Sequence, residues 1–185
     1  MVKQKIVPVV ETGLLVALAV VLELLFSALP ILKMPQGGHF TLALVPLCVI
    51  GYRRGWKYAL AGGIIYGLIN MLIDGFWGWG SVFFDYIFAF GAFFITGLFK
   101  KIGRKSIVWF IVGIVVAFFF RYLFASLSGV LFFAEGAAEY NMSAFYYSFI
   151  YYNLPYCAAS CAGSIIVMII LRQTKVVYLK LNDNE

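Results

Sequence analysis

The sequence predicts an all-α integral membrane protein, a bundle of six transmembrane helices that forms one membrane domain over residues 1–185. Hydrophobic residues make up 64% of the chain and charged residues only 12%, and the mean hydropathy is +0.97. A soluble domain, in contrast, has about 25% charged residues. A membrane-spanning helix takes about 20 residues, so six of them use about 120 positions and leave only short loops. A soluble ATP-hydrolysing domain therefore has no room to fold.

Six apolar segments follow one another between short polar or glycine-rich turns. The first contains Glu11 and Glu23 and lacks a small-residue cleavage site, which favours a membrane span over a signal peptide. The second is short for a full crossing. The predicted spans are residues 7–31, 40–52, 58–73, 82–99, 107–133 and 144–171.

The basic residues predict the orientation of the bundle. Most of the 14 lysines and arginines fall in alternate segments, at residues 3–5, 53–57, 100–105 and 172–180, and only Lys33 and Arg121 lie elsewhere. Because cytoplasmic loops carry an excess of such residues, this pattern predicts that both termini are cytoplasmic. The turns at residues 33–39, 74–81 and 134–143 then face outward.

Small residues at four-residue spacing predict close helix packing. They occur as Gly13-x-x-x-Ala17 in the first span and as Gly63-x-x-x-Gly67 in the third. For the third span, packing within the chain is favoured. For the first span, packing within the chain and docking to a partner subunit are both open.

Charged residues inside the spans need an explanation, because burying a charge at the bilayer centre costs about 2.5–3.5 kcal/mol. The candidates are Glu23, Asp85 and Arg121. Asp85 lies near the outward end of the fourth span, where it can pair with a cationic or amine-bearing ligand. An ion pair between Asp85 and Arg121 is the alternative interpretation, and the two are compatible.

Aromatic residues make up 19% of the chain and gather on the outward half. Most belong to interfacial belts or helix packing. Polar residues among them nevertheless predict a pocket for a flat, partly polar ring that can carry a positive charge. The polar candidates are Asp85, Asn153, Ser128 and Gln36, and the aromatic candidates include Trp77, Tyr86 and Tyr147.

The residues indicate no catalytic centre, metal site or cofactor. His39 is the single histidine, and the three cysteines contain no CxxC motif. Three scattered intramembrane charges also do not supply the convergent groups of a membrane enzyme. A stand-alone secondary transporter is an alternative function, although no internal repeat favours it.

Four sequence blocks in order resemble the thiamine-binding S-component (ThiT) family of energy-coupling factor (ECF) transporters, and the similarity covers nearly the whole chain. The most specific block is Met34-Pro35-Gln36-Gly37-Gly38 with Thr41-Leu42 and Val45-Pro46. The others are Asp85-Tyr86 with Ala89-Phe90-Gly91, Arg121-Tyr122 with Ser128-Gly129, and Tyr147-Ser148 with Tyr152-Asn153-Leu154-Pro155-Tyr156.

This resemblance implies a vitamin-binding protein of the cell membrane that has no enzymatic activity of its own. It implies an outward pocket in which Asp85, Tyr86, Tyr147 and Asn153 hold the vitamin, with Met34 and Gln36 on a lid formed by the first turn. The expected partners are a transmembrane coupling protein and two ATPase subunits. Gly13 and Ala17 occupy the place where the family docks its first helix on the coupling protein.

Four departures from the family pattern bear on the ligand. Asp85 replaces a longer Glu, Met34 replaces a frequent Trp, and Ala125 stands where a ligand-contacting histidine is expected. The spacing from Tyr147 to Asn153 is one residue longer than in the family. Thiamine is the first expectation, and a vitamin B6 form such as pyridoxine is the alternative.

Overall fold

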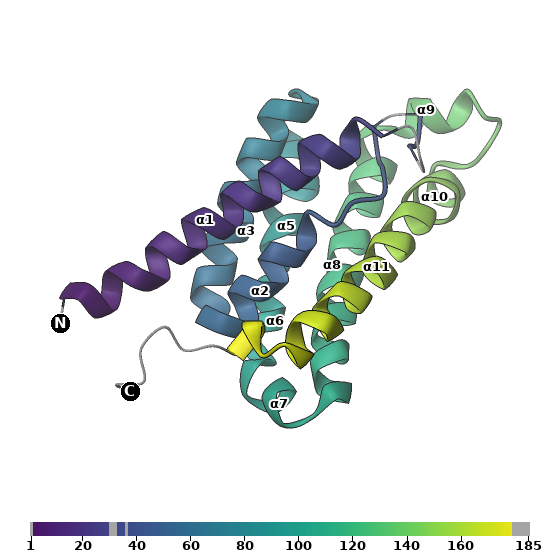
Figure 1. Ribbon diagram of the computed structural model, residues 1–185. Coiled ribbons are helices and arrows are strands. Elements are labelled where there is room, and N and C mark those ends of the chain that lie inside the picture. Colours follow the sequence, from purple (N-terminus) through teal and green to yellow (C-terminus); the bar gives the residue numbers. More distant parts are fainter. Residues whose placement is uncertain (1, 30–32, 36, 179–185) are drawn as a thin grey trace.

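The computed structural model describes residues 2–29, 33–35 and 37–178, and these residues form helices and connecting turns with no β-strand. Figure 1 shows the bundle. Its elements are α1 (Val2–Ser27), α2 (Leu44–Arg54), α3 (Trp56–Asp74), α4 (Trp79–Ser81), η1 (Val82–Phe88), α5 (Ala89–Gly91), α6 (Phe94–Leu98), α7 (Lys100–Lys105), α8 (Ile107–Phe132), α9 (Ala134–Ala138), α10 (Ala144–Tyr146), η2 (Tyr147–Asn153), α11 (Leu154–Gln173) and η3 (Val176–Tyr178).

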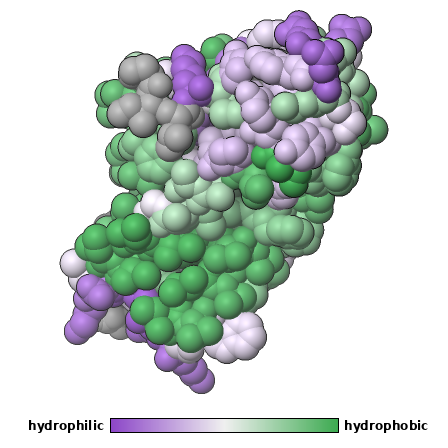
Figure 2. Space-filling model, turned by 90° about the vertical axis from the view of Figure 1, so that its right-hand side faces the viewer, coloured by the Kyte–Doolittle hydropathy of each residue, from purple (hydrophilic) through white to green (hydrophobic). Residues whose placement is uncertain are grey.

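Five described helical segments are long and apolar enough to cross a membrane. They are Ile6–Ser27, Trp56–Asp74, Trp79–Leu98, Ile107–Phe132 and Ala144–Gln173. In Figure 2, hydrophobic side chains form a broad band between hydrophilic residues at the two ends of the molecule. The chain is therefore a multi-pass membrane protein.

Helix α2 lies in the centre of the bundle and is shorter than the other long helices. Its 11 residues begin at Leu44, because residues 40–43 of the expected second span are not helical. Every residue from Leu44 to Tyr52 is buried, which agrees with its contacts with α1, α3, α6 and α11. Because the surrounding helices bury α2, its apolar residues pack against protein and the helix does not need the length of a full membrane crossing. The count of six spans stays a prediction.

Two helical segments contain a stretch of π-helix, η1 before α5 and η2 before α11. A π-helical stretch pairs residues five apart and is often found at functional sites. It also takes up an additional residue without ending the helix. The longer spacing between Tyr147 and Asn153 falls on such a stretch, because these two residues are the ends of η2.

Glycines on α3 let neighbouring backbone approach closely, as the sequence predicts for Gly63-x-x-x-Gly67. A Cβ atom at Gly63 would overlap the carbonyl oxygen of Phe90, and one at Gly67 would overlap that of Tyr86. Packing within the chain thus uses both glycines.

The corresponding pair on α1 is not used in this way. Gly13 and Ala17 lie on an exposed face of the helix, and a Cβ atom at Gly13 would meet nothing within 4 Å. Docking of this face to a partner remains a prediction.

We expect Gly63→Ala to lower the free energy of unfolding by about 1–3 kcal/mol, the usual cost of overpacking. The added methyl group would force α3 away from α5, because the atom that it meets is backbone. Thermal unfolding in detergent measures the effect. Gly13→Ala is the control, because its surroundings are open and alanine favours a helix. A melting temperature for Gly63→Ala as high as that of the control would contradict this close packing.

Candidate ligand-binding site

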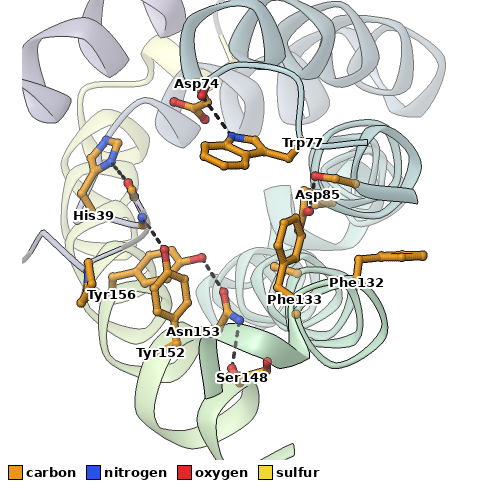
Figure 3. A pocket seen from close by; sticks show the side chains of 18 of the residues that line it. His39, Asp74, Trp77, Asp85, Phe132, Phe133, Ser148, Tyr152, Asn153 and Tyr156 are labelled. Atoms are coloured by element: carbon orange, nitrogen blue, oxygen red, sulfur yellow. Dashed lines mark hydrogen bonds between the residues drawn. The ribbon is translucent and has the colours of Figure 1, made fainter. Parts of the chain in front are cut away.

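One end of the bundle contains a cavity of about 720 Å³, a volume typical of small-molecule sites. Its lining comes from α1, the turn before α2, α3 and the turn after it, α4, the η1–α5 segment, α8, α9 and the η2–α11 segment (Figure 3). The predicted residues Trp77, Asp85, Tyr86, Tyr147 and Asn153 all line it. Residues from distant parts of the sequence therefore meet at one place.

The carboxylate of Asp85 is held by two serines. The hydroxyls of Ser81 and Ser128 each donate a hydrogen bond of 2.6 Å to its Oδ2 atom. No described residue bonds Oδ1, and Asp85 lines the cavity. One oxygen of an oriented carboxylate is thus available to a ligand.

Ser128 therefore has a different place from the one predicted. It is fully buried and contacts the Asp85 carboxylate, and it is not among the residues that line the cavity. Its position on α8 directs the hydroxyl toward η1. A role in positioning Asp85 fits this geometry better than direct contact with a ligand.

Tyrosine rings form one wall of the cavity. Tyr147 is buried, and its ring stacks on those of Tyr140 and Tyr152 with centroids 5.4 and 5.8 Å apart. Tyr152 in turn meets Tyr156 edge to face. This wall offers flat π surfaces to a ring-shaped ligand.

Asn153 is fixed by two hydrogen bonds at the same wall. Its amide nitrogen donates to the Ser148 carbonyl at 2.9 Å, and its amide oxygen accepts from the Tyr156 hydroxyl at 2.6 Å. The π-helical stretch thus brings both Tyr147 and Asn153 to the cavity despite their longer spacing.

The turn before α2 closes against the cavity and is tied to the η2–α11 segment. The Gly38 amide donates to the Tyr152 hydroxyl at 2.8 Å, and the Thr41 amide donates to the Ser160 hydroxyl at 3.0 Å. Within the turn, the Met34 amide donates a 2.6 Å hydrogen bond to the Gly38 carbonyl. Met34 is not among the lining residues, whereas the rest of the described turn is: Lys33, Pro35, Gly37, Gly38 and His39. Gln36 lies outside the described residues.

A buried acid–histidine pair joins this turn to α1. The His39 Nε2 atom lies 3.1 Å from Glu23 Oε1, and Nδ1 lies 2.9 Å from the Gly37 carbonyl. Burial opposes protonation of His39, but its hydrogen bonds to Glu23 and Gly37 raise the pKa of the imidazole above its ordinary value. Both ring nitrogens face acceptors, which only the imidazolium form satisfies.

Arg121 lines the cavity without pairing with Asp85. Its guanidinium lies over the rings of Phe90 and Tyr156, 5.1 and 5.7 Å from their centroids, and donates to the Cys157 sulfur at 3.0 Å. No ion pair with Asp85 is present among the described residues. The structure therefore favours the ligand interpretation of Asp85 over the ion-pair alternative.

Several lining residues were missed by the sequence reasoning. The sequence predicts Glu23 only as an intramembrane charge, Arg121 only as an ion-pair partner of Asp85, and Asp74 only as part of an outward turn. Ala125 lines the cavity where the family pattern has a histidine, which enlarges this side. The cavity also includes His39, Tyr152, Tyr156, Glu135 and Glu139.

Acidic side chains outnumber basic ones around the cavity. The acids are Glu23, Asp74, Asp85, Glu135 and Glu139, and the bases are Lys33, His39 and Arg121. In the described part of the chain, no three histidines, cysteines or acids are grouped to hold a metal ion. Acidic charge and aromatic walls together suit an organic cation.

A multi-pass helical bundle with a ring-lined, acidic cavity at one end defines a membrane protein that binds a small molecule. The chain belongs to the thiamine transporter protein family (Thia_YuaJ), whose model matches residues 9–180. This is a family of transport proteins and not of enzymes, and it confirms the resemblance found in the sequence blocks.

Two known proteins show the extent of the similarity. The thiamine transporter ThiT of Bacillus subtilis (strain 168) is 31% identical over 182 residues, which cover 92% of this chain and 93% of that protein. A solved structure of ThiT from Listeria monocytogenes matches with a TM-score of 0.82 and 24% identity. That match covers 96% of this chain and 100% of the other, and it supports the fold.

Proposed function

We propose that this chain is the substrate-binding S-component of an ECF transporter and that it captures thiamine at the extracellular face. The observation that carries the proposal is the Asp85 carboxylate, with one oxygen unbonded among the described residues, in a cavity walled by tyrosines. The names of the family and of the B. subtilis relative support thiamine as the ligand.

The chemistry of thiamine matches this cavity. Its aminopyrimidine ring can donate a charge-assisted hydrogen bond to Asp85, and its thiazolium ring is a flat cation. We assign Asp85, Tyr86, Tyr147, Asn153 and Trp77 to ligand contact. Gln36 and Met34 are assigned to the lid, and Ser128 positions Asp85.

The proposal includes an orientation and partners. Six crossings with both termini in the cytoplasm place the cavity at the outer face of the cell membrane. A transmembrane coupling protein and two ATPase subunits supply the energy for uptake. The exposed face of α1 around Gly13 and Ala17 is proposed to dock on the coupling protein, because small residues allow close helix contact in lipid.

A direct test is to identify the small molecule that copurifies with the chain in detergent by mass spectrometry. We expect thiamine, and we expect thiamine to bind much more tightly than pyridoxine in fluorescence titrations of the ligand-free protein. Tight pyridoxine binding with none for thiamine would overturn the assignment.

Transport without partners separates this proposal from a stand-alone secondary transporter. Vesicles that contain the chain alone should bind labelled thiamine without sustained uptake, with or without an ion gradient. Uptake that an ion gradient drives in these vesicles would contradict the S-component role.

A further inference from the structure

The cavity has a second acidic place, on α3, that is separate from Asp85. Asp74 is the last residue of α3, and its Oδ2 atom accepts a 2.8 Å hydrogen bond from the amide nitrogen of Asn70 one turn earlier. No described residue bonds Oδ1 of Asp74. In Figure 3, Asp74 and Asp85 lie on opposite sides of the Trp77 indole.

The side chain of Asn70 independently indicates that a ligand group binds next to Asp74. Its side chain is only 4% exposed, it lines the cavity, and its amide oxygen has no hydrogen-bond partner among the described residues. A buried amide oxygen without a partner destabilises the ligand-free protein, because it has lost its hydrogen bonds to water. A hydroxyl or amine of a bound ligand would remove this destabilisation.

Trp77 completes the arrangement. Its indole nitrogen donates a 3.1 Å hydrogen bond to the backbone carbonyl of Asp74, so ring and carboxylate are held by the same short turn. Trp77 is 64% exposed as a residue and lines the cavity. A cation beside a tryptophan face and a carboxylate gains from both.

We infer that Asn70, Asp74 and Trp77 form a second subsite that holds the cationic half of the ligand. The Asp74 carboxylate and the Trp77 ring stabilise the positive ring, and the amide oxygen of Asn70 accepts the hydrogen bond of the ligand's alcohol group. This inference rests on the proposed function, because thiamine carries a thiazolium ring with a hydroxyethyl arm. Asp85 then serves the other, uncharged ring.

Removing the negative charge of Asp74 tests the second subsite separately from Asp85. Asp74→Asn keeps the size of the side chain and its contact with Asn70 but removes the charge. We expect it to weaken thiamine binding at least tenfold in titration calorimetry of the full chain in detergent. The uncharged analogue with a thiophene in place of the thiazolium ring should bind this variant within about threefold of the wild type.

Two further variants show that the effect is local. Asp74→Glu keeps the charge and should retain thiamine affinity within about threefold. Asn70→Ala should weaken thiamine but not an analogue that lacks the hydroxyethyl arm. Melting temperatures of the ligand-free variants report whether each has folded.

The possible results separate the subsite from the proposed function. Unchanged thiamine affinity in Asp74→Asn, or equal loss of thiamine and the thiophene analogue, would overturn the second subsite. If the wild-type chain binds no thiamine, the proposed function itself fails. A loss confined to the cationic ligand supports both.

Discussion

Asp85→Asn is expected to weaken thiamine binding at least tenfold, which corresponds to about 1.4 kcal/mol. The amide keeps the shape of the side chain and still accepts the hydrogen bonds of Ser81 and Ser128. It lacks the negative charge, however, and a charge-assisted hydrogen bond is roughly twice as strong as a neutral one. Titration calorimetry in detergent measures the change.

Two variants distinguish contact from positioning. Ser128→Ala removes one of the two bonds to the Asp85 carboxylate without touching a ligand, so we expect a smaller loss, about two- to fivefold. Both variants should bind less tightly and melt near the wild-type temperature when ligand-free. Wild-type affinity in Asp85→Asn would remove this residue from the binding site.

The sequence predicts the helical architecture well where composition decides it. Long apolar runs such as 107–133 need about 20 residues to cross lipid, and the structure places α8 at Ile107–Phe132. The α2 segment differs, because its burial comes from the surrounding helices and not from lipid. Hydropathy does not distinguish an apolar segment that is buried by other helices from one that is buried by lipid.

The π-helical stretches lie beyond what periodicity can predict. An apolar pattern of 3.6 residues identifies a helix but not the one-residue insertion within it. The additional residue between Tyr147 and Asn153 is one of the departures from the family pattern. The structure shows that η2 contains both residues and that both line the cavity.

Partners far apart in sequence also escape sequence reasoning. Asp85 and Asn153 were predicted from their motifs, but the two serines that hold Asp85 lie on different helices. The pairing of Glu23 with His39 depends on how the turn between α1 and α2 folds back. The sequence places Asp74 in the outward turn at residues 74–81, whereas in the structure it is the last residue of α3.

The Glu23–His39 pair gives the largest stability effect that we expect. Both side chains are buried, at 5% and 7% exposure, and Thr41 donates a further 2.7 Å hydrogen bond to Glu23 Oε2. His39→Ala would remove the cationic partner of the buried Glu23 carboxylate, which would keep the hydrogen bond from Thr41. Loss of one partner of a buried pair costs about 3–5 kcal/mol, so we expect a fall of about 3 kcal/mol in the free energy of unfolding.

The same pair predicts that stability depends on pH. The charged groups that act on His39 are Glu23 on α1 and Asp74 on α3, and both favour the imidazolium. Because the pKa of His39 is raised, its stabilisation is complete below the ordinary value of 6.5 and is lost as the pH rises through the raised value. Melting temperatures measured from pH 6 to 9 should fall for the wild type.

A double variant separates the pair from other titrating groups. Glu23→Gln with His39→Ala removes both charges, so no carboxylate is left buried without its partner. We expect the double variant to be more stable than His39→Ala alone, and its melting temperature to vary less with pH than that of the wild type. Equal pH dependence in the two proteins would show that other groups cause it. The turn that closes the cavity would then be held by its bonds to Tyr152 and Ser160 and not by this charge.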